Sequence, residues 1–97
     1  MRFEYAPSLE KSLRRIPVAD QHRTAETIEQ IVGYFASREA PQGLGLKKLF
    51  HHEQLGGVFE ARISRARRLL FTVRHDAITF LRVGNHDDVQ RFIRSFQ

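Results

Sequence analysis

Apolar and polar residues alternate in the C-terminal half of the chain, and this pattern predicts a β-hairpin. Six apolar positions follow it: Phe59, Ala61, Ile63, Leu69, Phe71 and Val73. A loop at residues 65–67 would place all six on one face, with Ile63 opposite Leu69 and Phe59 opposite Val73. The other face would then carry the arginines of both strands.

Further strands are predicted on either side of this hairpin. Residues 78–83 are almost continuously apolar, which is typical of a central strand covered on both faces. A short strand is expected at residues 2–5, where Phe3 and Tyr5 alternate with charged residues, and another at residues 46–50.

The spacing of apolar residues predicts two helices near the N-terminus. The first spans about residues 7–15 and ends before Pro17, which cannot continue a helix from upstream. The second spans about residues 20–37, and residues 40–45 form a loop by their proline and glycines. One apolar stripe runs along the second helix: Ala25, Ile28, Ile31, Val32 and Phe35.

The predicted fold is therefore α+β, with an N-terminal strand and a helical hairpin packed on a small twisted antiparallel sheet, and a short C-terminal helix. Ninety-seven residues suffice for one domain over residues 1–97. There are no cysteines, so disulfides and thiolate chemistry are excluded. The sequence contains neither an apolar run long enough to span a membrane nor a signal-peptide core, so a cytoplasmic location is expected.

Positive charge is concentrated in the predicted sheet. The formal net charge is +5, of which residues 1–57 hold +1 (eight basic, seven acidic) and residues 58–97 hold +4 (eight basic, four acidic). Five arginines and no acidic residue lie between positions 62 and 74. Guanidinium groups bind phosphate well, so RNA or DNA is the first partner to consider. The alternative is a solvated basic face that keeps a sheet edge soluble.

The arginines are also the first candidates for chemistry. Arg62 and Arg68 are predicted neighbours across the hairpin, and Arg82 lies on the next strand. Together they could orient a scissile phosphate and stabilise the charge that develops on it. The remaining basic residues are candidates for binding an RNA backbone: Lys47, Lys48, Arg65, Arg67 and Arg74.

The segment from Gly84 to Asp88 combines a helix start with a histidine. Asn85 is suited to cap the helix, with Asp88 at its third position. His86 is not required for capping, and an imidazole at a strand end is a candidate general acid or base. A metal site is not expected, because no ligand spacing recurs among the histidines and aspartates, and no cofactor is predicted.

These segments resemble the RelE/ParE superfamily of type II toxin–antitoxin toxins. The residues that carry the resemblance are Leu46-Lys47-Lys48-Leu49, Phe59-Glu60-Ala61-Arg62-Ile63, Arg68-Leu69-Leu70-Phe71 and Phe80-Leu81-Arg82-Val83-Gly84-Asn85-His86-Asp87-Asp88-Val89. They are similar to the family's lysine-bearing segment, its arginine hairpin and the end of its last strand. The order of elements agrees over most of the chain.

The resemblance implies a metal-independent mRNA interferase, an endoribonuclease that cuts message in the ribosomal A site. Arg62 or Arg65 would take the role of the hairpin arginine, Arg68 that of the second arginine, and His86 that of the strand-end arginine or histidine. The chain departs from the pattern at Gln90, where many members have tyrosine, so either His86 would have to serve as the base or catalysis would be weak.

The resemblance also implies partners. These are a cognate antitoxin with an acidic amphipathic segment, the ribosome with its mRNA, and operator DNA bound by the toxin–antitoxin complex. Two other functions fit the sequence: a gyrase-poisoning toxin of the same superfamily, and a catalytically weak module that binds nucleic acid or an antitoxin.

Overall fold

A computed structural model describes residues 1–37 and 45–96, and it has the predicted α+β architecture. Apart from Gly45, the loop predicted at residues 40–45 lies outside the described residues. The elements, in chain order, are β1 (Arg2–Tyr5), α1 (Pro7–Leu13), α2 (Val18–Ser37), β2 (Lys47–His52), β3 (Gly56–Arg62), β4 (Arg68–Arg74), β5 (Ala77–Gly84) and α3 (His86–Arg94).

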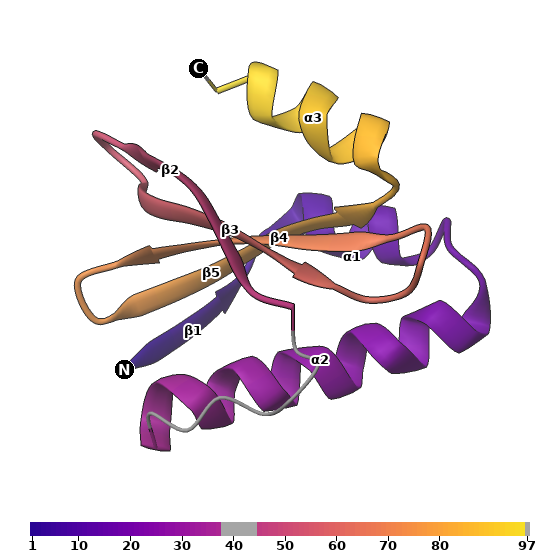
Figure 1. Ribbon diagram of the computed structural model, residues 1–97, viewed down its shortest axis with the longest axis horizontal. Helices are drawn as coiled ribbons and strands as arrows, with labels where there is room; N and C mark the ends of the chain where they lie inside the picture. The colour runs from indigo at the N-terminus through magenta and orange to yellow at the C-terminus, as the bar shows by residue number, and fades with distance from the viewer. Residues whose placement is uncertain (38–44, 97) are drawn as a thin grey trace.

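The strands form one mixed sheet in the order β1-β5-β4-β3-β2 (Figure 1). The pairs β2–β3, β3–β4 and β4–β5 are antiparallel, whereas β1 lies at the edge and pairs with β5 in parallel. The strand predicted at residues 78–83 is present as β5, between β1 and β4, but the middle strand of the sheet is β4 and Thr79 of β5 is only partly buried. The parallel pairing is possible because α1 and α2, together with β2 to β4, separate β1 from β5 in the chain.

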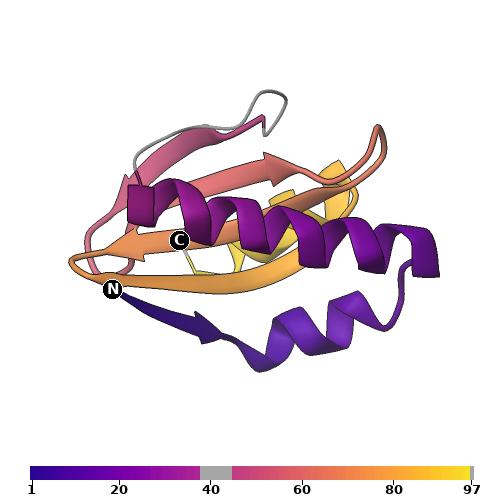
Figure 2. The ribbon, with the colours of Figure 1, turned by 90° about the horizontal axis from the view of Figure 1, so that it is seen from below.

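The larger core lies between the sheet and the two N-terminal helices. Figure 1 shows α2 on one side of the sheet and α3 on the other, and Figure 2 shows α2 lying over the sheet and running roughly along the strands. All six alternating apolar residues of the hairpin belong to this core, as predicted. Leu9 of α1 and Ile31 of α2 are buried against them, so both helices cover the same face.

The predicted register of the hairpin is wrong by two residues. Ala61 pairs with Leu69 and Phe59 with Phe71, and the connecting loop is residues 63–67 rather than 65–67. Ile63 leaves the ladder but stays buried, and its N–H donates to the Arg67 carbonyl. Because side chains alternate with a period of two, an even shift keeps every residue on its predicted face.

The buried stripe of α2 also differs from the prediction in one position. Ala25 is exposed, whereas Thr24 and Thr27 are buried. Their hydroxyls donate to the carbonyls of Asp20 and Arg23, at 2.7 Å and 2.8 Å. A threonine that satisfies its hydroxyl within the helix can occupy an apolar interface, which an apolar pattern does not detect.

The second face of the sheet is not an open basic surface, because α3 covers its middle. Val58 and Leu70 from the sheet and Val89 and Ile93 from α3 form a second buried cluster. The arginines of this face therefore lie around the rim of α3. Among the described residues, no helix is long and apolar enough to span a bilayer.

Candidate nucleic-acid interface

Three of the predicted arginines meet at one end of the sheet, on the side of α3. Arg62 and Arg68 are paired directly across β3 and β4. Arg82 on β5 pairs with Leu70 on β4, two residues along the strands from the pair of Gly84 and Arg68. We call this cluster of Arg62, Arg68 and Arg82 the basic end. The three arginines therefore lie on adjacent strands, as predicted.

A β-bulge directs Arg82 toward α3. The pairing of β4 with β5 passes from Leu70–Arg82 to Phe71–Phe80, which leaves Leu81 as an extra residue. Such a bulge re-aims a side chain at the end of a ladder. The Arg82 guanidinium carbon lies 5.4 Å from the centroid of the Phe92 ring, a cation–π contact. Its Nε is buried without a hydrogen-bond partner.

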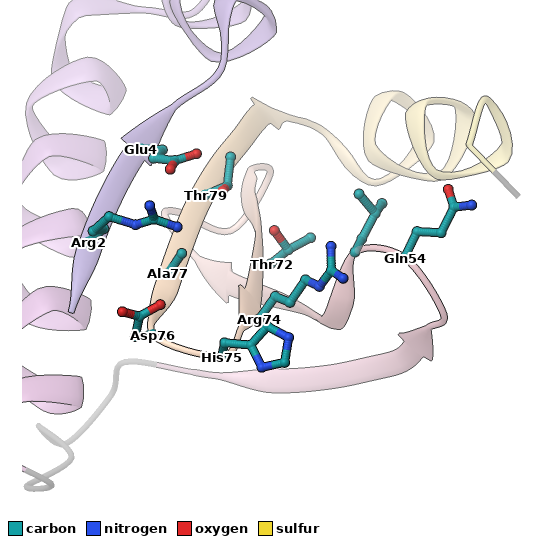
Figure 3. Close-up of a pocket in the computed structure, with 10 residues that line it drawn as sticks. Arg2, Glu4, Gln54, Thr72, Arg74, His75, Asp76, Ala77 and Thr79 are labelled. Atoms are coloured by element: carbon teal, nitrogen blue, oxygen red, sulfur yellow. The ribbon is translucent and has the colours of Figure 1, made fainter.

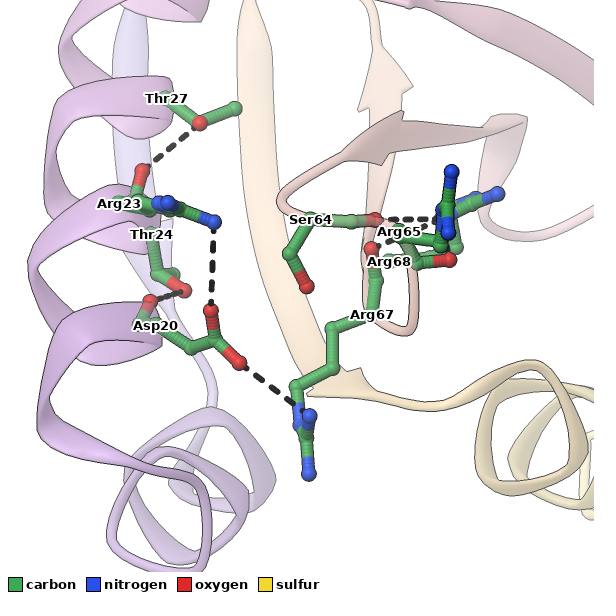
Figure 4. A network of polar contacts seen from close by, with 8 residues as sticks. All are labelled: Asp20, Arg23, Thr24, Thr27, Ser64, Arg65, Arg67 and Arg68. Atoms are coloured by element: carbon green, nitrogen blue, oxygen red, sulfur yellow. Dashed lines mark hydrogen bonds and ion pairs between the residues drawn. The ribbon is translucent and has the colours of Figure 1, made fainter.

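Arg68 has a structural contribution that the sequence did not indicate. Its Nη1 donates to the carbonyls of Ser64 at 2.9 Å and Arg67 at 3.0 Å. These bonds hold the 63–67 loop against the start of β4 (Figure 4). Arg62, at the end of β3, and Arg65, within the loop, remain exposed.

Arg67 extends toward α2, apart from Arg68, and lines a cleft that Arg82 also lines. Its Nη1 lies 3.2 Å from Asp20 Oδ2 on α2 (Figure 4). Asp20 is 8% exposed and also lies 3.9 Å from Arg23. An ion pair with this little solvent access fixes the hairpin loop to the N-terminal turn of α2.

The other basic candidates are spread over the sheet. Lys47 pairs with Glu60 and shares the side of the basic end, whereas Lys48 pairs with Phe59 and faces the opposite side. Arg74 ends β4, six residues from Arg68, which corresponds to roughly 20 Å along a strand. The sequence therefore grouped residues that the fold separates.

Arg74 lines a different cleft, of about 300 Å³, at the far end of the sheet (Figure 3). Basic and acidic groups are mixed there: Arg2, Glu4, Arg74, His75 and Asp76. His75 has a φ of 53° in the turn between β4 and β5. This mixture of charges is less suited to a polyanion than the basic end is.

His86 begins α3 next to the basic end. Asn85 caps the helix as predicted, since its side chain accepts the Asp88 N–H at 2.8 Å. His86 is exposed, and it follows Gly84, the partner of Arg68, by two residues. The backbone of His86 therefore lies near the basic end, and its imidazole is exposed to solvent.

One basic residue near the basic end, Arg15, was not predicted from the sequence. Arg15, from the turn after α1, lines a cleft of about 160 Å³ at the C-terminal end of β5. Ser12 brings it there, because the Ser12 hydroxyl accepts the Val83 N–H at 3.0 Å and ties α1 to β5. No local pattern signals this contact, which joins segments 71 residues apart. Within the part of the chain that the structure describes, no cluster of three or more potential metal ligands occurs.

Solved structures provide the clearest comparison. The archaeal RelE–RelB complex from Pyrococcus horikoshii matches with a TM-score of 0.66 and 20% identity, covering 87% of this chain and 92% of that one. The E. coli DinJ–YafQ complex gives 0.64 and 14%, covering 92% and 98%. The chain has the fold of the RelE-like toxins. The YoeB/ParE toxin from Agrobacterium tumefaciens gives 0.64 and 14%, covering 89% and 99%.

The sequence itself does not extend this likeness. No known family matches it, and no curated protein matches it significantly. The similarity therefore concerns the RelE-like fold, and the chemistry has to be argued from the residues of this chain.

Proposed function

We propose that the protein is the toxin of a type II toxin–antitoxin pair and acts as a ribosome-dependent mRNA endoribonuclease. The observation that carries this proposal is the basic end itself, with His86 beside it. Arg62 and Arg68 face each other, and Arg82 is held over Phe92 rather than left free in solvent. Preorganised guanidinium groups stabilise a phosphate whose charge increases in the transition state.

The proposed reaction is an internal transfer at phosphorus. The 2′-oxygen of the RNA attacks the adjacent phosphate, the bond to the 5′-oxygen breaks, and the products are a 2′,3′-cyclic phosphate and a 5′-hydroxyl. The 2′-hydroxyl proton passes to a base, and the leaving 5′-oxygen accepts a proton from an acid. His86 would supply the imidazole for one of these two transfers.

The remaining basic residues would position the RNA. Lys47 lies on the side of the basic end and would contact a backbone phosphate, as would Arg65 in the exposed hairpin loop. Arg68 would act both on the phosphate and on the loop, because its Nη1 already binds loop carbonyls.

The proposed partners follow the same charge argument. RelB and DinJ are bound in the matched complexes, and an acidic amphipathic antitoxin segment would complement the rim of α3. The complex would form in the cytoplasm and bind operator DNA. If its dissociation rate were the same in low and high salt, this electrostatic account would be wrong.

The test uses purified protein, ribosomes stalled on a defined message, and primer extension to map new RNA ends. We expect cuts within the A-site codon, with at least a 100-fold loss of rate in Arg62→Ala and His86→Ala. Arg14→Ala removes a positive charge from an exposed residue at the C-terminal end of α1 and should retain the activity.

The other outcomes separate the competing functions. Absence of cuts together with toxicity in cells would refute the nuclease and favour a topoisomerase as the target. Absence of both would favour a binding module. Equal losses in Arg14→Ala and Arg62→Ala would refute the assignment of the site.

A further inference from the structure

The cleft at the C-terminal end of β5 has the composition of an anion site. Three arginines from three separate segments line it, namely Arg15, Arg67 and Arg82. One carboxylate, that of Asp88, lies among them, and it is 3.4 Å from Arg91 Nη1. Three positive charges and one negative charge give the lining a net charge of +2.

The ion pairs around the cleft do not cancel this charge. Arg67 is paired with Asp20, and Asp88 is paired with Arg91, so the two pairing partners contribute −1 and +1. The net charge remains +2 when both are included. The guanidinium groups of Arg15 and Arg82 have no carboxylate within ion-pair distance among residues 1–37 and 45–96.

The side chains of Arg67 and Arg82 are held by contacts, whereas Arg15 is exposed on a turn that a hydrogen bond holds in place. The Ser12–Val83 hydrogen bond places the turn that carries Arg15, and the Asp20 ion pair holds Arg67. Arg82 is stacked on Phe92 and has a buried Nε–H without an acceptor. Arg82 lines the cleft without a carboxylate partner among the described residues, so an anionic oxygen bound there would gain a charge-assisted hydrogen bond from its guanidinium.

Small neighbouring groups leave room for a ligand. A Cβ atom on Gly84 would lie 2.9 Å from Asp88 Cβ, so glycine is needed where the end of β5 passes under α3. The cleft holds about 160 Å³, which suits a phosphate group rather than a nucleobase with its sugar. The N-terminus of α3 adds the positive end of its macrodipole.

We infer that this cleft is a phosphate subsite for the RNA backbone, adjoining the basic end through Arg82. The inference rests on the proposed nuclease function. Arg82 lines the cleft and belongs to the basic end, so a strand whose scissile phosphate lies at the basic end would place a flanking phosphate near Arg15 and Arg67. Arg15 is then a binding residue of the site.

The first measurement detects the anion directly and needs no cleavage. Arginine Nε–H resonances of the ¹⁵N-labelled protein are recorded during titration with inorganic phosphate, with sodium chloride at matched ionic strength as reference. We expect a saturable shift of the Arg82 Nε–H, and an affinity about 5- to 10-fold weaker in Arg15→Gln. Arg14→Gln is the matched control, and its affinity should equal that of the wild type.

The second measurement distinguishes an RNA phosphate from free phosphate. The probe is an RNA of ten uridine nucleotides with 2′-O-methyl groups, which cannot be cut by its own 2′-oxygens. Its binding constant is measured at several salt concentrations. Loss of one phosphate contact should lower the slope of log K against log salt by about 0.7 in Arg15→Gln and leave it unchanged in Arg14→Gln.

Each result has one consequence. If phosphate produces no saturable shift, or both variants behave alike, the subsite is refuted. A phosphate shift without any effect of Arg15→Gln on RNA binding would refute the backbone assignment. Cleavage on ribosomes without phosphate binding would overturn this inference alone, whereas phosphate and RNA binding without cleavage would support the subsite and refute the nuclease.

Discussion

The ion pair between Asp20 and Arg67 should stabilise the fold by an amount that its exposure determines. The Asp20 side chain is 11% exposed and that of Arg67 is 28% exposed, whereas Arg23, the other cation near Asp20, is 59% exposed. Fully buried pairs cost about 3–5 kcal/mol when one partner is removed, and surface pairs contribute about 0–1 kcal/mol. The intermediate exposure places the loss in Arg67→Gln at about 2 kcal/mol.

The two sides of this pair should respond unequally. Arg67→Gln leaves the Asp20 carboxylate buried, with Arg23 3.9 Å away, so the remaining charge is poorly compensated. In Asp20→Asn the freed guanidinium can turn toward solvent, and we expect a smaller loss of about 1 kcal/mol. Arg23→Gln is the matched control, with an expected loss below about 0.5 kcal/mol.

Urea unfolding of the three single variants and of the Asp20→Asn/Arg67→Gln double variant measures these losses of stability. A loss of about 2 kcal/mol corresponds to a fall in Tm of about 8–16 °C for a chain of this length. The double-mutant cycle should give a coupling of about 1–2 kcal/mol between Asp20 and Arg67, free of the helix-dipole contribution of Asp20. A coupling below about 0.3 kcal/mol, or equal losses in Arg67→Gln and Arg23→Gln, would refute the reasoning.

Three further predictions concern stability. Gly56→Ala should cost about 2–4 kcal/mol in urea unfolding, because Gly56 has a φ of +87° and a Cβ there would clash with the Val73 carbonyl. Gly33→Ala, at an exposed position of α2 where a Cβ meets nothing within 4 Å, should be neutral or stabilising. Asn85→Ala should cost about 1 kcal/mol through loss of the α3 cap, and a variant as stable as the wild type would contradict this. Ile93→Ala should cost about 2–5 kcal/mol and speed hydrogen exchange in α3 before the rest of the chain; uniform acceleration would contradict a separate α3 cluster.

The faces of the hairpin were predictable from the sequence, but its register was not. Alternation depends only on whether a shift is odd or even, so the six apolar residues were assigned to the correct core while their partners were off by two. The longer loop is held by one distant contact and by local hydrogen bonds. Arg67 reaches Asp20 on α2, and Arg68 binds the loop carbonyls.

The candidate site was predictable in part for the same reason. Arg62, Arg68 and Arg82 come together because adjacent strands bring them together, which a strand prediction can foresee. Arg15 lies at the site because α1 packs on β5. Arg67 is turned away from Arg68 because its guanidinium binds Asp20 on α2. Both placements depend on tertiary contacts, which have no local pattern.

Arg82 separates the functional interpretation of the positive charge from the alternative of a solvated basic face. An arginine that serves solubility extends into water, where its donors are satisfied at no cost. Arg82 instead lies over Phe92, with its Nε buried among protein atoms, so its guanidinium is held in one place. A guanidinium that is already positioned loses less conformational freedom when it binds an anion. The distribution of charge alone leaves the two interpretations equal, and the placement of this one side chain favours phosphate binding.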